Sequence, residues 1–300
     1  MQTPLVHIHL EEGKKIFFAS DFHLGSPSYQ ESRLREKKVV DWIERQRHQM
    51  AALFLLGDIF DYWFEYRTVV PKGFVRLLAK LAELTESGIP VYFLCGNHDT
   101  WTLDYFQKEI GMQVYTGNIE LAVGEARFLL GHGDGLGKGE KGYKLMKAIF
   151  NAQVSRVLYA ALHPYWGAMI AGKMSRHSRK SGIRRNQRPE KIEENAPKPF
   201  LAETREHTKN KNLLVFMQRY LRQHPIDGFI FAHRHWPVLV EINSESPEVR
   251  HVDIAPVAPE KRTSHKAYYM NTGDWIRYFT YGSFDGKNLK LEGDLIRKTF

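Results

Sequence analysis

Five short apolar runs in this 300-residue sequence are each followed by a segment that carries aspartate, asparagine or histidine. The runs are short enough to be buried strands, and they cover residues 16–18, 51–56, 91–95, 126–130 and 229–232. In layered α/β sheets, the loops beyond the carboxyl ends of the strands gather at one crevice, where ligands bind. We therefore expect the polar residues after these runs to share one site. They are Asp21, His23, Asp58, Asn97, His132, His233 and His235.

The segments between these runs alternate between strand and helix patterns at first and are mostly strands later. Apolar residues recur at helical spacing over 31–49 and 74–87, and a short third helix is expected before residue 110. The segments 119–123 and 126–130 flank a turn and predict a hairpin. A layered α/β fold, with two packed mixed β-sheets flanked by helices, accounts for both halves. Later strands are expected at 238–242, 249–254, 267–270, 276–281 and 289–295.

The sequence is expected to consist of a core, formed by residues 1–136 and 227–300, and a helical, basic insertion at 137–226. Within the insertion, residues 140–178 carry more apolar side chains than one helix needs to pack on a sheet. A pair of such helices can shelter acyl chains while its basic face meets anionic headgroups. Alternatively, the two apolar faces pack only on each other. Residues 182–212 are polar and contain three prolines, which predicts a mobile or partly helical excursion.

The seven residues of the expected site form a donor set for metal ions. Seven oxygen and nitrogen donors are too many for one ion, whereas two ions that share a bridging carboxylate need about this number. Imidazole with carboxylate suits manganese first and iron or zinc next, and it matches magnesium or calcium poorly. The only cysteine, Cys95, lies in an apolar run and fits a buried hydrophobe in a reducing cytoplasm. Taken singly, several of these motifs also fit a polar turn, but the complete ordered set favours two metal ions.

In this order, the motifs resemble those of the calcineurin-like metallophosphoesterases. They are Asp-x-His at 21–23, Gly-Asp at 57–58, Gly-Asn-His-Asp at 96–99, Gly-His at 131–132 and His-x-His at 233–235. The resemblance implies a water between two ions that loses its proton and attacks phosphorus in line, without a covalent enzyme intermediate. It also implies two ligand groups that share a bridging Asp58: Asp21, His23 and His235 for one ion, and Asn97, His132 and His233 for the other.

The resemblance gives roles to two further residues that are not expected to be ligands. In this family, the histidine that matches His98 contacts the phosphate and assists the leaving oxygen, and Asp99 is expected to orient it. The alternative is that His98 is only a hydrogen-bonding loop residue.

Within the superfamily, the sequence is most similar to the UDP-2,3-diacylglucosamine hydrolases of the lipid A pathway. The likeness rests on residues 57–63, 132–134, 142–143, 156–178 and 235–237. It implies hydrolysis of the pyrophosphate bond of UDP-2,3-diacylglucosamine to lipid X and UMP. Well-known members carry arginine where this chain has histidine at position 98, and the chain has extra residues near 182–212. The substrate contacts expected from this likeness are Asn97, His98, Glu140, Ser178, Arg179 and His233.

The net charge of +9 indicates an anionic partner, and seven Lys and Arg residues lie between 173 and 188. This cluster fits either a solvated loop or a contact with a diphosphate or a membrane surface. The cluster also permits a nuclease, but few aromatic residues interleave the charges to stack bases, so this option is weaker and nucleic acid is not predicted as a partner. No protein partner is predicted either. No apolar run is long enough to span a membrane, and residues 1–10 lack a signal pattern. We expect a cytoplasmic protein, peripherally associated with the anionic inner-membrane surface, that acts on a lipid-linked sugar nucleotide.

Two other functions stay open from the sequence alone. One is a soluble metallophosphoesterase that acts on nucleotides, phosphodiesters or phosphoproteins. The other is a non-catalytic scaffold, which the complete ligand set argues against.

Overall fold

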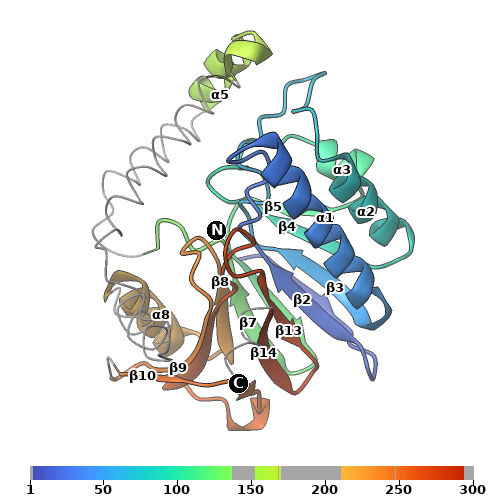
Figure 1. Ribbon diagram of the computed structural model, residues 1–300. Helices are drawn as coiled ribbons and strands as arrows, with labels where there is room; N and C mark the ends of the chain where they lie inside the picture. The colour runs from blue at the N-terminus through green and yellow to red at the C-terminus, as the bar shows by residue number, and fades with distance from the viewer. Residues whose placement is uncertain (1–2, 137–152, 168, 170–210, 247, 294–300) are drawn as a thin grey trace, which may run out of the picture.

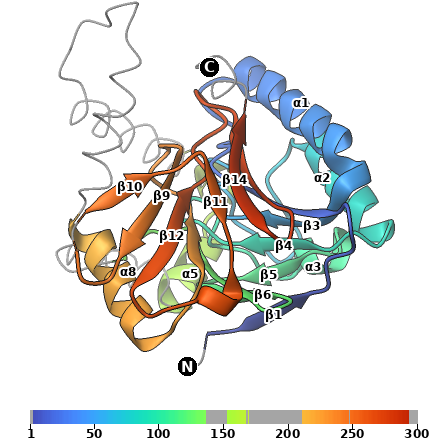
Figure 2. The same ribbon diagram turned by 90° about the horizontal axis from the view of Figure 1, so that it is seen from below.

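The computed structural model describes residues 3–136, 153–167, 169, 211–246 and 248–293. Within these residues, two seven-stranded β-sheets pack face to face, with helices on their outer faces (Figures 1 and 2). The predicted layered α/β fold is therefore confirmed. The helical elements are α1 (Tyr29–Gln46), η1 (Arg47–Gln49), α2 (Val75–Glu86), α3 (Tyr105–Glu109), α5 (Gln153–Ala160), α8 (Lys211–Gln223) and η2 (Pro259–Lys261).

The first sheet combines a parallel half with an antiparallel half. β2 to β5 run parallel, whereas β13, β14 and β11 extend the sheet in antiparallel pairs. Phe18 lies opposite Phe54, and the Phe54 ring stacks on Tyr92 with centroids 4.4 Å apart. In spatial order the strands are β11 (Ile254–Pro256), β14 (Asn288–Gly293), β13 (Thr280–Phe284), β2 (Lys15–Ala19), β3 (Met50–Leu55), β4 (Val91–Leu94) and β5 (Gln113–Tyr115).

The second sheet contains the predicted hairpin, in which β6 and β7 pair antiparallel. β7 then pairs in parallel with β8, so the segments that follow these two strands lie next to each other. In spatial order the strands are β1 (Leu5–Ile8), β6 (Ile119–Val123), β7 (Ala126–Leu130), β8 (Gly228–Phe231), β12 (Lys266–Asn271), β9 (Val238–Asn243) and β10 (Val249–His251).

Three apolar layers hold these elements together. Between the sheets, residues such as Phe18 and Phe128 interdigitate; outside the first sheet, Trp42 of α1 packs with Leu77 and Leu81 of α2. α8 covers the second sheet with its own apolar face. α1 begins where the Ser28 side chain accepts a hydrogen bond from the Glu31 amide, which is typical of a helix N-cap.

Some predicted strands differ from those in the structure. The strand expected at 276–281 is wrong: residues 275–278 form a turn, and β13 begins at Thr280. The Asp274 carboxylate accepts hydrogen bonds from the amides of residues 276–278, so these amides do not pair in a sheet. The single strand expected at 249–254 is also wrong, because β10 and β11 belong to different sheets. The sequence did not predict β1 or β5.

The predictions about the insertion are not tested by the fold. The segment 182–212 and the basic cluster at 173–188 lie outside the described residues, apart from residues 211 and 212 at the start of α8. The division into core and insertion stays a prediction. Among the helices in the described part of the chain, none is long and apolar enough to cross a membrane.

Candidate metal centre

The polar residues that follow the buried strands lie together in the structure. The loops after β2 and β3 of the first sheet supply Asp21, His23 and Asp58, and the loops after β7 and β8 of the second sheet supply three histidines. Within each of two groups, one donor atom per residue lies within 4.8 Å of the others. The groups are Asp21, His23 and His235, and Asp58, His132 and His233.

In the first group, two imidazoles and one carboxylate face the same point. His235 Nε2 lies 3.2 Å from Asp21 Oδ1 and 3.2 Å from His23 Nε2. The other oxygen of Asp21, Oδ2, accepts hydrogen bonds from the Ser20 hydroxyl and the His233 amide. Asp21 Oδ1 is buried and has no hydrogen-bond partner among the described residues. One carboxylate oxygen is therefore held by the protein and the other is directed at the two histidines.

The second group is built around His132. Its Nε2 lies 3.4 Å from Asp58 Oδ2, 3.2 Å from His233 Nδ1 and 3.2 Å from Asn97 Oδ1. Its Nδ1 donates to the Leu56 carbonyl oxygen at 2.8 Å, which leaves Nε2 directed at these three groups. Asp58 Oδ2 also lies 3.7 Å from His23 Nε2 of the first group. Asp58 thus stands between the two groups.

The protonation of these side chains fits a site built for cations. Burial tends to lower the pKa of His132, but the Asp58 carboxylate overrides it and raises that pKa to about 10. Burial and the charge on His132 lower the pKa of His233 to about 4. The facing ring nitrogens of these two histidines lie 3.2 Å apart. Burial would raise the pKa of Asp58, yet the neighbouring histidines hold it well below its usual value.

The backbone around these side chains is in an unusual conformation. Five of the grouped residues, Asp21, His23, Asp58, His233 and His235, have positive φ angles between 43° and 68°. Left-handed backbone at non-glycine residues costs free energy and concentrates at functional sites. Arg35 of α1 is buried and donates from Nη1 to the carbonyl oxygens of Phe22, His23 and Ser26 at 2.9–3.0 Å. This guanidinium holds the loop after β2 in place.

Comparison with protein families gives a match over residues 14–237 to the calcineurin-like phosphoesterases. The chain belongs to this family. The matched region contains all the residues of both groups, and these His and Asp clusters are consistent with a site for two metal ions.

Curated relatives of this phosphoesterase share one description. The chain is 38% identical to a UDP-2,3-diacylglucosamine hydrolase of Porphyromonas gingivalis over 93% of its own length and 97% of that protein. It is 26% identical to a UDP-2,3-diacylglucosamine hydrolase of Escherichia coli over 78% of this chain and 87% of that protein. Among solved structures, an uncharacterized Streptococcus pneumoniae protein described as a predicted phosphoesterase aligns with 93% of this chain and 89% of its own. That alignment has a TM-score of 0.34 and 13% identity, and the family assignment does not depend on it.

The surroundings of His98 in this phosphoesterase differ from the expectation. His98 Nδ1 lies 2.8 Å from the Asp61 carbonyl oxygen, and its ring packs edge-on against His23 at 4.9 Å. The expectation that Asp99 orients His98 is wrong. The Asp99 carboxylate instead accepts hydrogen bonds from the backbone amides of Gly96 and residues 58–60. Burial and the nearby Asp58 charge raise the pKa of Asp99 to about 7.

Asp61 belongs to the site, although the sequence analysis gave it no role. Its carboxylate Oδ1 lies 3.4 Å from His23 Nδ1, while its carbonyl oxygen meets His98. It forms a third group of possible ligands with these two histidines. Its spacing three residues after Asp58, in the same strand-end loop, is the only sequence signal that points to it.

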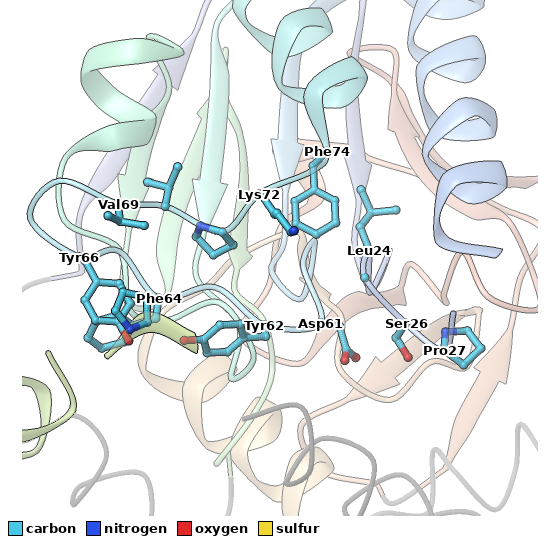
Figure 3. Close-up of a pocket in the computed structure, with 14 residues that line it drawn as sticks. Leu24, Ser26, Pro27, Asp61, Tyr62, Phe64, Tyr66, Val69, Lys72 and Phe74 are labelled. Carbon is cyan, nitrogen blue, oxygen red and sulfur yellow. The ribbon is translucent and has the colours of Figure 1, made fainter. Parts of the chain in front are cut away.

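Asp61 also lines a groove of about 300 Å³. Figure 3 shows Tyr62, Phe64 and Tyr66 on one side of Asp61, and Ser26 and Pro27 on the other. Further lining residues are largely apolar: Leu24, Val69, Val70, Pro71, Phe74 and Pro164.

α5 lies against the same loop. Its Tyr159 ring packs on Phe64 and Trp101 with centroids 4.6 and 4.8 Å apart, and its hydroxyl lies 3.2 Å from the Tyr62 hydroxyl. Of the expected substrate contacts, Asn97, His98 and His233 lie at the centre. The other three, Glu140, Ser178 and Arg179, lie outside the described residues.

Proposed function

We propose that this phosphoesterase hydrolyses the pyrophosphate bond of UDP-2,3-diacylglucosamine to lipid X and UMP, as a step of lipid A biosynthesis. The observation that carries the proposal is the 38% identity with the Porphyromonas gingivalis relative over 97% of that protein. A match of this extent includes the segments outside the metal centre, where substrate choice is made.

The proposed roles of the ligands follow from their positions. When bound, two divalent cations supply Lewis-acid stabilisation of the phosphoryl charge and a water of lowered pKa. Asp58 would be shared by both ions, because its Oδ2 lies near a histidine of each group. The ligand set of four imidazoles, one amide and two carboxylates favours manganese, then iron or zinc. The remaining ligands are Asp21, His23 and His235 for one ion, and Asn97, His132 and His233 for the other.

His98 is the proposed catalytic acid. Because its Nδ1 donates to the Asp61 carbonyl oxygen, the ring presents Nε2 to the substrate. In its protonated form, His98 donates a hydrogen bond from Nε2 to the phosphate oxygen that leaves with lipid X. Asp61 fixes the ring in this orientation.

The groove is proposed to take part of the lipid half of the substrate. Asp61 is one of its lining residues and contacts His98 through its carbonyl oxygen, so the groove adjoins the proposed catalytic acid. Most of its lining residues are aromatic or aliphatic, which suits acyl chains, and Ser26, Asp61 and Lys72 add polar groups. Large apolar side chains are also exposed on α5 and the segment after it, which supports peripheral association with the cytoplasmic face of the inner membrane. They are Val157, Leu158, Leu162, Tyr165 and Trp166.

An assay with three substrates tests the proposal. With Mn²⁺ added, turnover of UDP-2,3-diacylglucosamine is compared with that of its de-acylated form and of a generic phosphodiester. We expect the acylated substrate to have the highest kcat/KM by at least about 100-fold, since apolar burial of acyl chains contributes about 0.8 kcal/mol per methylene. Equal rates on all three would contradict the proposal and indicate a phosphoesterase of broad substrate range.

A matched pair of variants tests the role of the groove. Val69→Asp places a charge in the groove, whereas Val75→Asp places one at an exposed position on α2 outside it. We expect Val69→Asp to raise KM for the diacyl substrate about tenfold and to leave the de-acylated substrate unaffected. Val75→Asp should change neither. An equal effect of both variants on both substrates would exclude the groove as the acyl site.

A further inference from the structure

A buried carboxylate outside the ligand set faces one of the metal-site histidines. Asp274 lies in the turn between β12 and β13 and is 2% exposed. Its Oδ2 is 3.2 Å from His235 Nδ1. On the other side of the same ring, His235 Nε2 lies 3.2 Å from Asp21 Oδ1 and faces the metal centre. His235 is therefore held between a carboxylate outside the metal site and one inside it.

The other oxygen of Asp274 is engaged by the backbone. Oδ1 accepts hydrogen bonds from the amides of Ile276, Arg277 and Tyr278 at 3.1, 2.7 and 3.2 Å. These bonds fix the carboxylate, so that only Oδ2 is directed at the histidine. This explains why the turn replaces the strand expected at 276–281.

The same turn is attached to the first metal group at a second point. The Trp275 amide donates to the Asp21 carbonyl oxygen at 3.2 Å, and the Thr272 and Ser20 hydroxyls lie 2.7 Å apart. Ser20 in turn donates to Asp21 Oδ2 at 2.6 Å. The β12–β13 turn thus supports both Asp21 and His235.

We propose that Asp274 is a positioning residue that fixes the tautomer and orientation of His235 and thereby sets the metal affinity of the Asp21, His23 and His235 group. A carboxylate that accepts Nδ1–H leaves the lone pair on Nε2, the nitrogen that faces the centre. Carboxylate–histidine pairs of this kind orient metal ligands and raise their basicity, and their loss costs about 10–100-fold in metal affinity. The proposal concerns metal binding and holds whichever phosphoester is the substrate.

The Asp274→Asn variant tests the proposal because it separates structure from tautomer. Its amide oxygen can still accept the three backbone N–H groups, which preserves the turn. Its NH₂ group then faces His235 Nδ1 as a donor, which places the ring proton on Nε2 and opposes metal binding. We expect isothermal titration with Mn²⁺ to show about 10–100-fold weaker binding at one of two sites. The Tm of the chelated protein should stay within about 2 °C of wild type.

Asp285→Asn is the matched control. Asp285 also accepts backbone amides in a turn, from Lys287 at 3.0 Å and Asn288 at 2.7 Å, and it lies in the β13–β14 hairpin. This variant should bind two Mn²⁺ with wild-type affinity. Wild-type affinity in Asp274→Asn would overturn the proposal.

A double-mutant cycle with His235→Ala shows whether Asp274 acts through His235. If it does, Asp274→Asn adds no further loss of Mn²⁺ affinity in the His235→Ala background, whereas a full additive loss would overturn the proposal. Should Asp274→Asn fail to fold, long-range ¹H–¹⁵N spectra of the Zn²⁺-loaded wild-type protein report the tautomer directly. We expect His235 to be protonated at Nδ1, and a ring protonated at Nε2 would refute the assignment.

Discussion

Gly96 offers a quantitative test of how closely the strand ends must approach each other. It lies just beyond β4, and a Cβ built on it would fall 2.5 Å from the Asp58 backbone nitrogen and closer still to Asp58 Oδ1. An ordinary van der Waals contact of a Cβ with another heavy atom is at least 3.4 Å long. The Asp58 nitrogen would therefore have to move away from the new Cβ by 0.9 Å or more. The φ angle of Gly96 is not positive, so alanine is compatible with the backbone and the effect isolates the contact.

The Gly96→Ala variant is therefore expected to displace the bridging carboxylate. A misplacement of about 1 Å in a catalytic group costs about 100-fold in rate. Overpacking at a buried site costs about 2 kcal/mol of unfolding free energy, which for 300 residues corresponds to a decrease in Tm of about 3 °C. The assays are kcat with saturating Mn²⁺, metal content by atomic emission, and thermal unfolding of the chelated protein.

Gly117→Ala is the control for this variant. A Cβ at Gly117 meets nothing within 4 Å, and its φ is not positive, so activity and Tm should both stay at wild-type values. If Gly96→Ala retained kcat within threefold and bound two Mn²⁺ normally, the close approach of β4 to Asp58 would not matter for the site. The reasoning from strand-end geometry to metal bridging would then be refuted.

Three further outcomes are expected. Asp58→Ala should lose both bound metal and turnover, whereas His98→Ala should lose turnover and keep its metal; stoichiometric metal loss in His98→Ala would make His98 a ligand. Burial would lower the pKa values of His132 and His235, but the carboxylates of Asp58 and Asp21 raise both to about 10. Without metal, the stability that these two protonated histidines add is therefore present below pH 6.5 and is lost toward pH 10. Cations must displace these protons, so the Mn²⁺-induced rise in Tm should be larger at pH 8.5 than at pH 6.5, and equal shifts would contradict this. Arg35→Met removes three buried hydrogen bonds and should lower the free energy of unfolding, measured in urea, by about 3 kcal/mol. The control Arg33→Met, at an exposed position, should lower it by less than about 0.5 kcal/mol.

The core of this fold and its donor set could be predicted because the evidence for them is local in sequence. An apolar run followed within five residues by a polar group identifies both a buried strand and the side chain at its carboxyl end. Asp21 and Asp58 are of this kind, and so is His132. Since parallel strands direct these ends to one edge, local signals were sufficient to predict that distant residues would lie together.

Residues that act over long sequence distances could not be predicted in this way. Asp274 lies 39 positions from His235, and Arg35 contacts carbonyl groups 9 to 13 positions away. Asp274 follows the strand expected at 267–270 but belongs to no recognised motif, and Arg35 lies within a helix. The error about Asp99 has the same origin, because its neighbour in sequence is His98, but its hydrogen bonds go to amides about 40 positions away. Sequence patterns show which side chains are polar, and only the packing shows which polar atoms they meet.

Each of the two ligand groups takes members from both sheets. Asp21 and His23 of the first sheet meet His235 of the second, and Asp58 of the first meets His132 and His233 of the second. A cation held by either group would therefore be a non-covalent cross-link between the two sheets, at one end of their apolar interface. Any change that slides one sheet against the other, even at the far end of that interface, will alter metal occupancy before it alters the secondary structure.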